Sequence, residues 1–452
     1  MNLIVELIKY MMILLTGIYT YYSFNVFRFK NKKHQNKIYV ILTLILFALH
    51  FTGYFTLYFQ NQSMKLVYLY GAEVLLFVLV LLLYQIIYPK ISRLLLLNML
   101  MLLAIGFIMQ TRLSYDNTVK QVVIIGSSFL ASLIVPFIIR KVRKLREYGW
   151  VYGGVGILLL LVVLFLGRTS YGATNWIQIF GISIQPSEFV KLLYVFSIAS
   201  LLKKRTDFKQ VCYISVLAGV TVIILVLQRD LGGALIFFVT YVFMLYVATS
   251  KPLYLLSGLA GGSLAAVVAY RLFSHVRVRV LAWQNPFAYI DKEGYQITQS
   301  LFAIGTGGWA GMGLNRGLPT NIPVVDSDFI FSAISEEMGG VIAICIILIY
   351  ASCFVMFLNI ALEQEELFYR LLAVGFAVMF AFQVILSIGG VIKFIPSTGV
   401  TLPLISMGGS SALSVVFVFM ILQGVRLVGK SYPKNEKHHH GGKDDSKMVG
   451  II

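Results

Sequence analysis

The chain has 452 residues, of which 59% are hydrophobic and 12% are charged, and its mean hydropathy is +0.85. This composition excludes a water-soluble globular protein and is typical of an integral membrane protein. The formal net charge of +18 would suit a nucleic-acid partner, but the way in which the basic residues are distributed excludes that reading.

Apolar segments long enough to cross a bilayer recur along the whole chain. They predict an all-α, polytopic membrane protein with about thirteen transmembrane helices. The segments between 186 and 271 follow one another closely, so one of them is a candidate re-entrant helix. The segments are 3–24, 38–59, 65–88, 93–110, 119–140, 149–167, 186–202, 211–228, 231–249, 252–271, 329–358, 367–391 and 403–427.

Basic residues are concentrated in every second connection between these segments. By the positive-inside rule such connections are cytoplasmic, which places the N-terminus outside and the C-terminus inside the cell membrane. The basic residues therefore orient the chain and do not recruit nucleic acid. The connections that hold 23 of the 37 Lys and Arg residues are 25–37, 89–92, 140–148, 203–210, 250–251, 359–370 and the tail from Arg426.

No cofactor is required by the sequence. The three cysteines lie apart in apolar spans without Cys-x-x-Cys spacing, which indicates neither a disulfide framework nor a thiolate metal site. The His438–His440 cluster lies in a charged tail that is predicted to be disordered, and it lacks further ligands. The first span lacks a basic n-region and a small-residue cleavage site, so we expect it to be retained.

The longest stretch without an apolar segment, 272–327, is predicted to be a large external loop. Five basic residues lie in or beside it, among them Arg277 and Arg279. A solvated loop explains any one of these charges. The five together indicate a cationic surface that binds an anionic, phosphate-bearing lipid headgroup. The run 295–304 is predicted to form an amphipathic helix, and the glycines of 305–313 favour tight turns over a plain linker.

Two polar clusters lie at the predicted outer ends of spans. Glu188 and Lys191 share one helix face at i,i+3, after Pro186 in the first turn. They either shape a polar cavity or form a self-neutralising ion pair that lets the helix insert. Asp230, in Gln228-Arg-Asp230-Leu-Gly-Gly233, either faces the same cavity or makes a simple helix turn with Arg229.

Asp328 is the most informative residue, because it ends the polar loop and opens a predicted membrane helix. Desolvation at that boundary raises a carboxyl pKa toward the range useful for proton transfer. Ser332 and Ser335 would continue a polar stripe along the helix. Asp326 is a more solvated rival, and the alternative role of Asp328 is to cap the helix N-terminus. Glu336 and Glu337 receive no chemical role.

A last polar cluster, 393–411, contains two prolines and three glycines in an apolar setting. Irregular backbone at membrane depth requires burial in protein or a wet cavity, and Lys393 would then face phosphate. Together the clusters predict a polar cavity that opens to the outside.

These segments resemble the signatures of the SEDS family (shape, elongation, division and sporulation), which includes the RodA, FtsW and SpoVE proteins. The similarity extends over residues 93–428. The motifs that carry it are Gln185-Pro-Ser-Glu-Phe-x-Lys191, Asp230-Leu-Gly232, Gly294-Tyr-Gln-x-x-Gln-Ser300, Ser327-Asp-Phe-Ile-Phe331 with Glu336-Glu337, and Pro396-x-Thr-Gly with Ser-x-Gly-Gly-Ser-Ser411.

The resemblance implies a ten-helix core over 93–428, three additional N-terminal helices in 1–92 and a cytoplasmic tail, 429–452. It implies an inverting glycosyltransferase that polymerises lipid II into peptidoglycan during elongation, division or sporulation, together with membrane lipids and a class B penicillin-binding protein as partners. Asp328 matches the catalytic aspartate and would act as general base. A divalent cation is compatible with a pyrophosphate substrate. The residues assigned to substrate binding are Arg277, Arg279, Glu188, Lys191, Lys393, Asp230, Gln299 and Ser332.

The chain also departs from the family pattern. Arg229 stands where Pro is usual before the Asp-Leu-Gly motif, and Asn285 stands where an acidic residue is common. Two alternatives remain open at this point. A flippase or transporter for lipid-linked precursors is compatible with broken helices and buried charges. A non-enzymatic scaffold for the penicillin-binding protein is the other alternative.

Overall fold

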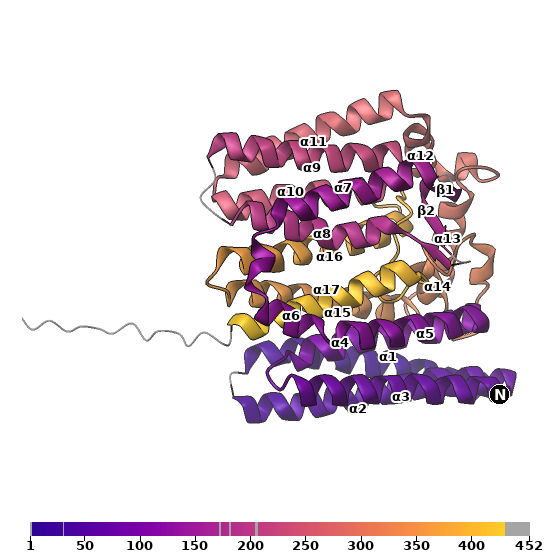
Figure 1. The fold of residues 1–452 in the computed structure, drawn as a ribbon. Coiled ribbons are helices and arrows are strands. Elements are labelled where there is room, and N and C mark those ends of the chain that lie inside the picture. Colours follow the sequence, from indigo (N-terminus) through magenta and orange to yellow (C-terminus); the bar gives the residue numbers. More distant parts are fainter. Residues whose placement is uncertain (1, 30, 171–172, 180–181, 204–206, 430–452) are drawn as a thin grey trace, which may run out of the picture.

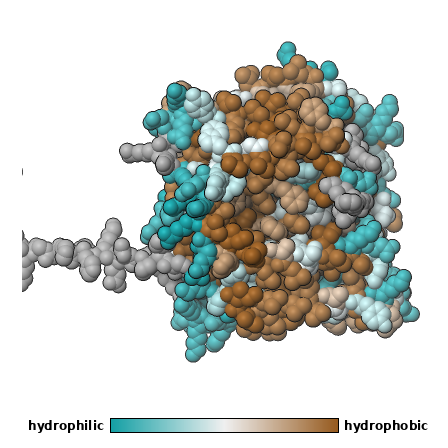
Figure 2. Space-filling view, in the orientation of Figure 1, coloured by the Kyte–Doolittle hydropathy of each residue, from teal (hydrophilic) through white to brown (hydrophobic). Residues whose placement is uncertain are grey.

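Long apolar helices lie side by side in the computed structural model, which describes residues 2–29, 31–170, 173–179, 182–203 and 207–429 (Figure 1). Helices satisfy every backbone polar group internally, as lipid requires. Hydrophobic residues cover the middle of the surface, and hydrophilic residues gather at both ends of the bundle (Figure 2). The prediction of an all-α, polytopic membrane protein is confirmed. The predicted tail, 430–452 with His438–His440, lies outside the described residues.

Local sequence sets where many helices begin. Ser92 and Ser114 accept a hydrogen bond from the backbone of the helix that follows, and Pro186 and Pro252 occupy a first turn. The α-helices are α1 (Asn2–Asn25), α2 (Lys32–Asn61), α3 (Met64–Ile87), α4 (Arg93–Leu113), α5 (Tyr115–Ser132), α6 (Val135–Lys141), α7 (Gly149–Leu166), α8 (Pro186–Leu201), α9 (Phe208–Leu227), α10 (Leu231–Thr249), α11 (Pro252–Leu272), α12 (Ser274–Gln284), α13 (Tyr295–Gly307), α14 (Ile330–Glu337), α15 (Gly340–Leu362), α16 (Leu367–Val391) and α17 (Gly409–Gly429). Short 3-10 helices cover Val26–Arg28, Arg143–Arg146, Pro286–Tyr289 and Pro319–Asn321.

Within the described residues, twelve helices are long and apolar enough to cross a membrane. The remaining predicted span, 186–202, forms α8, which has 16 residues and packs against α7, α10, α16 and α17. The chain begins α1 at the end of the bundle that carries α12 and α13, and it ends α17 at the opposite end (Figure 1).

Helix α4 lies at the centre of the molecule, and its most apolar stretch is completely buried. It packs against α2 of the N-terminal unit and against α5 and α15 of the rest of the bundle. Gly106 lets the chain at 404–405 approach closely, since a Cβ there would lie 2.9 Å from Ile405 Cα. The predicted division at residue 92 falls between α3 and α4, yet both sides share one hydrophobic core.

Four predicted elements differ from the structure. The span 119–140 is divided, because α5 ends at Ser132 and α6 begins at Val135. The span 329–358 is two helices, because Gly339 has a φ of +93° and ends α14 before α15 begins. Gly311 and Gly339 meet there: a Cβ on Gly311 would lie 2.6 Å from Gly339 N. The last span starts at Gly409, since 403–408 is irregular. The external loop contains α12 as well as the predicted amphipathic helix, which is α13.

A small antiparallel sheet, which we did not predict, lies between α7 and α8. Its strands are β1 (Arg168–Ser170), β2 (Ala173–Ile179) and β3 (Ile182–Ile184), in the order β1-β2-β3. Ile177 pairs with Ile184, and Arg168 pairs with Trp176 beside a register shift. We call the end of the bundle that carries this sheet, α12 and α13 the sheet end (Figure 1).

Candidate active site

A polar cavity of ≈390 Å³ opens at the sheet end of the bundle. Its walls come from segments that are far apart in the sequence: β2, the N-terminal ends of α8 and α10, α12, α13, the turn before α14 and the irregular chain before α17. The lining residues that can bind or transfer protons and charges are Asn175, Gln185, Arg229, Asp230, Arg279, Glu293, Gln296, Ser327, Asp328, Thr398, Thr401 and Ser411.

Asp328 lies in the turn that precedes α14, with its carboxylate at the cavity wall. Helix α14 begins at Ile330 without a side-chain cap, so the capping role does not describe Asp328. Gly399 has a φ of +71° and brings the opposite wall close: a Cβ there would lie 3.5 Å from Asp328 Oδ2. The chain is thus shaped to leave space beside this carboxylate.

Burial raises the pKa of the Asp328 carboxyl to about 6. The hydrogen bond from Ser327 and the positive charge of Arg279 both lower this pKa, and the neighbouring charge of Asp326 raises it. A carboxylate that titrates near neutral pH can accept a proton and still be ionised when it is needed. Asp328 therefore has the properties of a general base.

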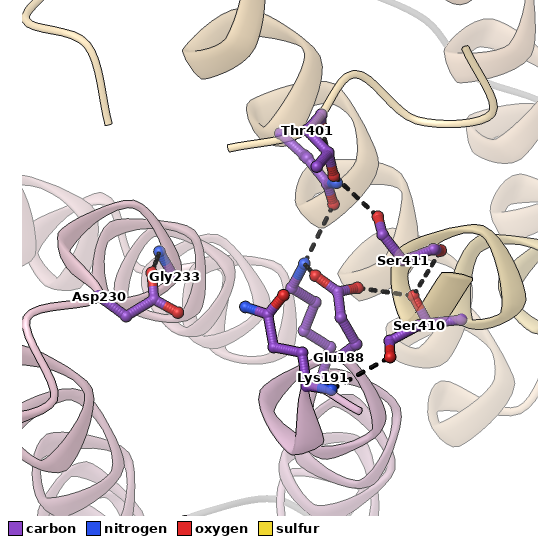
Figure 3. Close-up of polar contacts among 10 residues, drawn as sticks. Glu188, Lys191, Asp230, Gly233, Thr401, Ser410 and Ser411 are labelled. Atoms are coloured by element: carbon purple, nitrogen blue, oxygen red, sulfur yellow. Dashed lines mark hydrogen bonds and ion pairs between the residues drawn. The ribbon is translucent and has the colours of Figure 1, made fainter. Parts of the chain in front are cut away.

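Two other carboxylates line the cavity, but each is less suited to that role. Asp230 accepts a hydrogen bond of 2.8 Å from Gly233 N and caps α10 (Figure 3), so its carboxylate is already engaged. No ion pair joins Asp230 to Arg229 in the described part of the chain, in contrast to the predicted helix-turn alternative. Glu293 is exposed at the rim of the cavity.

Arg279 supplies positive charge inside the cavity. It extends from α12, donates a hydrogen bond of 3.4 Å to Ser397 O, and interacts electrostatically with both Asp230 and Asp328. Burial lowers the pKa of this guanidinium, and the two carboxylates raise it. Its planar donors suit a phosphate group.

Arg229 is a second cavity cation, which sequence reasoning did not select. Its φ of +62° is unusual for a residue with a side chain, and the side chain is exposed at the cavity. The sequence does mark this position. Arg229 stands where the SEDS pattern usually has a proline before the Asp-Leu-Gly motif, and a proline cannot adopt a positive φ.

Glu188 and Lys191 lie behind the cavity wall. Lys191 Nζ is 2.7 Å from Glu188 Oε1 (Figure 3). Glu188 Oε2 accepts a hydrogen bond of 2.7 Å from the Ser414 hydroxyl. Lys191 also donates to Gln383, whose amide donates to the carbonyl of Thr401 in the wall. The pair therefore supports the wall and does not line the cavity.

The other predicted substrate-binding residues also lie away from the cavity lining. Arg277 is exposed on α12, and the backbone carbonyl of Lys393 accepts a hydrogen bond of 3.1 Å from Trp283. Ser332 is buried against Ser300, at 2.7 Å, and joins α14 to α13. Gln299 is partly buried outside the lining, where Gln296 of the same motif takes the position at the cavity.

Glu336 and Glu337, to which we gave no chemical role, organise the preceding loop. Glu337 accepts from Arg112 of α4 at 3.0 Å, and Glu336 accepts from Leu318 N at 2.9 Å. In the described part of the chain no group of three or more His, Cys, Asp and Glu side chains is arranged to hold a metal ion.

Known proteins are similar to this chain in sequence and in fold. The family model described as "Cell cycle protein", which covers FtsW, RodA and SpoVE, matches residues 85–430. A peptidoglycan glycosyltransferase RodA of Mycobacterium tuberculosis is 35% identical over 328 residues, 68% of this chain and 70% of that protein. A probable peptidoglycan glycosyltransferase FtsW of Aliivibrio salmonicida is 32% identical over 325 residues, 68% of this chain and 80% of that protein.

Solved structures agree with these relatives. A chain in the structure described as "Structural coordination of polymerization and crosslinking by a peptidoglycan synthase complex" superposes with a TM-score of 0.66 at 27% identity, covering 75% of this chain and 98% of that chain. The rod shape determining protein RodA of Thermus thermophilus superposes with a TM-score of 0.56 at 25% identity, with 75% and 98% covered. The resemblance seen in the sequence is confirmed, and the chain belongs to the FtsW/RodA/SpoVE family of cell cycle proteins.

Proposed function

We propose that this chain is a peptidoglycan glycosyltransferase that polymerises lipid II into glycan strands, with Asp328 as general base. The single observation that carries the catalytic assignment is the position of Asp328: a partly desolvated carboxylate at the wall of a polar cavity that also contains Arg279. The relatives named as peptidoglycan glycosyltransferases support the same activity.

The reaction joins two lipid-linked sugars. A sugar hydroxyl of the acceptor is a poor nucleophile at neutral pH, so Asp328 accepts its proton as the oxygen attacks the anomeric carbon of the donor. The bond between that carbon and the pyrophosphate oxygen breaks, and the lipid pyrophosphate leaves with the electron pair. A single displacement with one base converts an α-linked donor into a β-linked glycan.

Arg279 and Arg229 stabilise the departing pyrophosphate. Negative charge accumulates on the leaving group in the transition state, and fixed cations in a partly dehydrated cavity lower its energy. Arg279 is held beside Asp328 by its hydrogen bond to Ser397. Arg229 faces the same cavity and forms no ion pair in the described part of the chain.

The proposal includes an orientation and a partner. The distribution of basic residues supports a sheet end that faces outside the cell membrane, where glycan strands are assembled. The related synthase complex, described as coordinating polymerisation and crosslinking, supports a class B penicillin-binding protein as transpeptidase partner. Such a pair would extend the cell wall during elongation, division or sporulation.

Purified protein incubated with lipid II tests the proposal, with the glycan product resolved on a gel. We expect polymer from the wild type and none from Asp328→Asn, while Asp326→Asn serves as a matched control that retains activity. Equal polymer from wild type and Asp328→Asn would reassign the base. If the protein moves lipid II across the membrane of proteoliposomes but forms no polymer, it is a flippase. A stable complex with the transpeptidase and no turnover would indicate a scaffold.

A further inference from the structure

Helices α1 and α2 precede the region that the family model matches, 85–430, and their polar side chains contact the loop that connects α13 to α14. We call residues 311–317 of that loop the strap. We propose that α1 and α2 hold the strap against α14 and thereby position Asp328, with Lys9 and Gln60 as the positioning residues. The inference rests on the proposed function, because it concerns the same carboxylate.

Helices α1 and α2 contact the strap at two backbone carbonyls. Lys9 Nζ of α1 donates a hydrogen bond of 3.3 Å to Gly311 O. Gln60 Nε2, near the end of α2, donates one of 3.0 Å to Leu314 O. The Leu314 side chain is itself buried, so this part of the strap is docked in the molecule and is not a free loop.

Charge and packing add to this contact. Glu6 of α1 lies 3.6 Å from Arg316 of the strap and also pairs with Lys9. Gly313 has a φ of +101°, and a Cβ there would lie 3.7 Å from the buried Val5. The first turns of α1 therefore form a surface that the strap matches by charge and by shape.

The opposite side of the strap is fixed to Glu337 at the end of α14. The backbone N–H of Gly313 donates a hydrogen bond of 2.9 Å to the backbone carbonyl of Glu337. The backbone N–H groups of Asn315 and Gly317 donate to the side-chain carboxylate of Glu337, at 2.9 and 3.2 Å. Arg112 of α4 holds the same carboxylate at 3.0 Å. The strap is thus clamped between the N-terminal helices and α14.

Movement of α14 is transmitted directly to the base. The helix begins at Ile330, two residues after Asp328, and Ser332 N donates to Phe329 O at 2.9 Å in its first turn. No flexible linker separates the turn from the helix. A displacement of a catalytic group by about 1 Å can cost about 100-fold in rate, so a strap that fixes α14 has a large effect on turnover.

The N-terminal helices are a firm support, since buried polar contacts join them to the core. Ser23 of α1 lies 2.7 Å from Ser352 of α15, and Asn98 of α4 donates to the same hydroxyl at 3.0 Å. Tyr54 of α2 bonds Thr111 of α4 at 2.8 Å. Figure 1 places the start of α1 at the sheet end of the bundle.

The test uses the full-length variants Lys9→Met, Gln60→Leu and the double variant. The readouts are turnover of lipid II and amide hydrogen exchange over the strap, residues 311–317. We expect the double variant to lower kcat about tenfold with KM within about twofold of wild type, because alignment and not binding is lost. The Asn315 and Gly317 amides should exchange faster. Lys9→Arg keeps a cationic donor at this position, so its kcat and strap exchange should match wild type, unlike those of Lys9→Met.

Ser23→Ala is the matched control, since it removes a buried hydrogen bond of α1 away from the strap. We expect it to lower the melting temperature while kcat and exchange of the strap stay at wild-type values. Wild-type kcat in a double variant whose strap exchanges faster would overturn the positioning role. Unchanged exchange in the double variant would overturn the contact itself. Absence of polymer from the wild type would overturn the proposed function, and faster exchange in the variants would still support the hold of α1 and α2 on the strap.

Discussion

Among single residues, Asp328 stands out because its surroundings oppose its charge and nothing in the helix that follows uses it. Burial raises the pKa of its carboxyl to about 6. The carboxylate of Asp230, in contrast, accepts a hydrogen bond from Gly233 N and caps α10. A charged side chain that is held in an unfavourable environment, and that does not stabilise the fold there, is typical of a functional site.

The first prediction concerns stability. A carboxyl whose pKa is raised from 3.8 to about 6 by folding favours the protonated form, so it contributes stability at low pH that is lost as the pH rises through about 6. Asp328→Asn mimics the protonated form. We expect this variant to melt at a higher temperature than wild type at about pH 8, with the gap closing below about pH 6. A variant that melts lower than wild type at about pH 8 would contradict the prediction.

The second prediction concerns the cavity cations. Arg279→Gln should lower kcat about 100-fold, as loss of a fixed donor to developing charge does. Arg229→Asn should lower kcat about tenfold, since asparagine tolerates a positive φ and only the charge is lost. Arg277→Asn, on the exposed side of α12, is the control and should stay within about twofold of wild type. Steady-state kinetics with lipid II checks all three, and an effect of Arg277→Asn as large as that of Arg279→Gln would refute the assignment.

At the scale of elements, the pair on α8 explains how a charged sequence is tolerated inside the bundle. The Glu188 and Lys191 side chains are only 6% and 8% exposed, and each has a further hydrogen-bond partner. Both predicted roles therefore apply in part: the pair neutralises itself, and through Gln383 it supports Thr401 in the cavity wall.

The third prediction follows from this burial. Glu188→Gln or Lys191→Met alone leaves one buried partner uncompensated and should cost about 3 kcal/mol of unfolding free energy. The double variant should recover most of that loss, because no uncompensated charge remains. Denaturation of the purified protein measures the effect. Single variants as stable as wild type would mean that water reaches the pair.

The sequence predicted the helices well because span length and hydropathy suffice for a membrane helix. It could not predict the break at Gly339, which depends on the backbone of Gly311 from a distant loop. It also could not separate Arg277 from Arg279. Two residues apart on a helix, they point to opposite sides, but α12 was not predicted and so its faces were unknown.

The candidate base was predictable from one position, whereas the rest of the cavity was not. Asp328 was recognisable as a carboxylate at a boundary between polar and apolar sequence. The wall, in contrast, is assembled from β2, α8, α10, α12 and α13, and its composition follows from packing. Lys191 and Ser332 carry the right chemistry but lie behind the wall, which no spacing along the chain reveals.

At the scale of the whole molecule, the fourth prediction concerns orientation. Helix α1 starts at the sheet end and α17 ends at the opposite end of the bundle (Figure 1). The basic loops predict that the sheet end faces outward. A single cysteine at exposed Trp309 should react with an impermeant thiol reagent on intact cells, and one at exposed Glu365 should react only after lysis. The reverse pattern would invert the topology and remove the cavity from the site of wall growth.

The pH dependence of lipid II polymerisation is the most direct measurement of the central claim, that Asp328 is an ionised base held beside Arg279. We expect kcat/KM of the wild type to rise with pH through a limb near pH 6, as the Asp328 carboxyl loses its proton. Arg279→Gln removes the charge that lowers this pKa, so the limb should move to higher pH. A rate that is flat across this range, or a limb that Arg279→Gln leaves in place, would contradict the account.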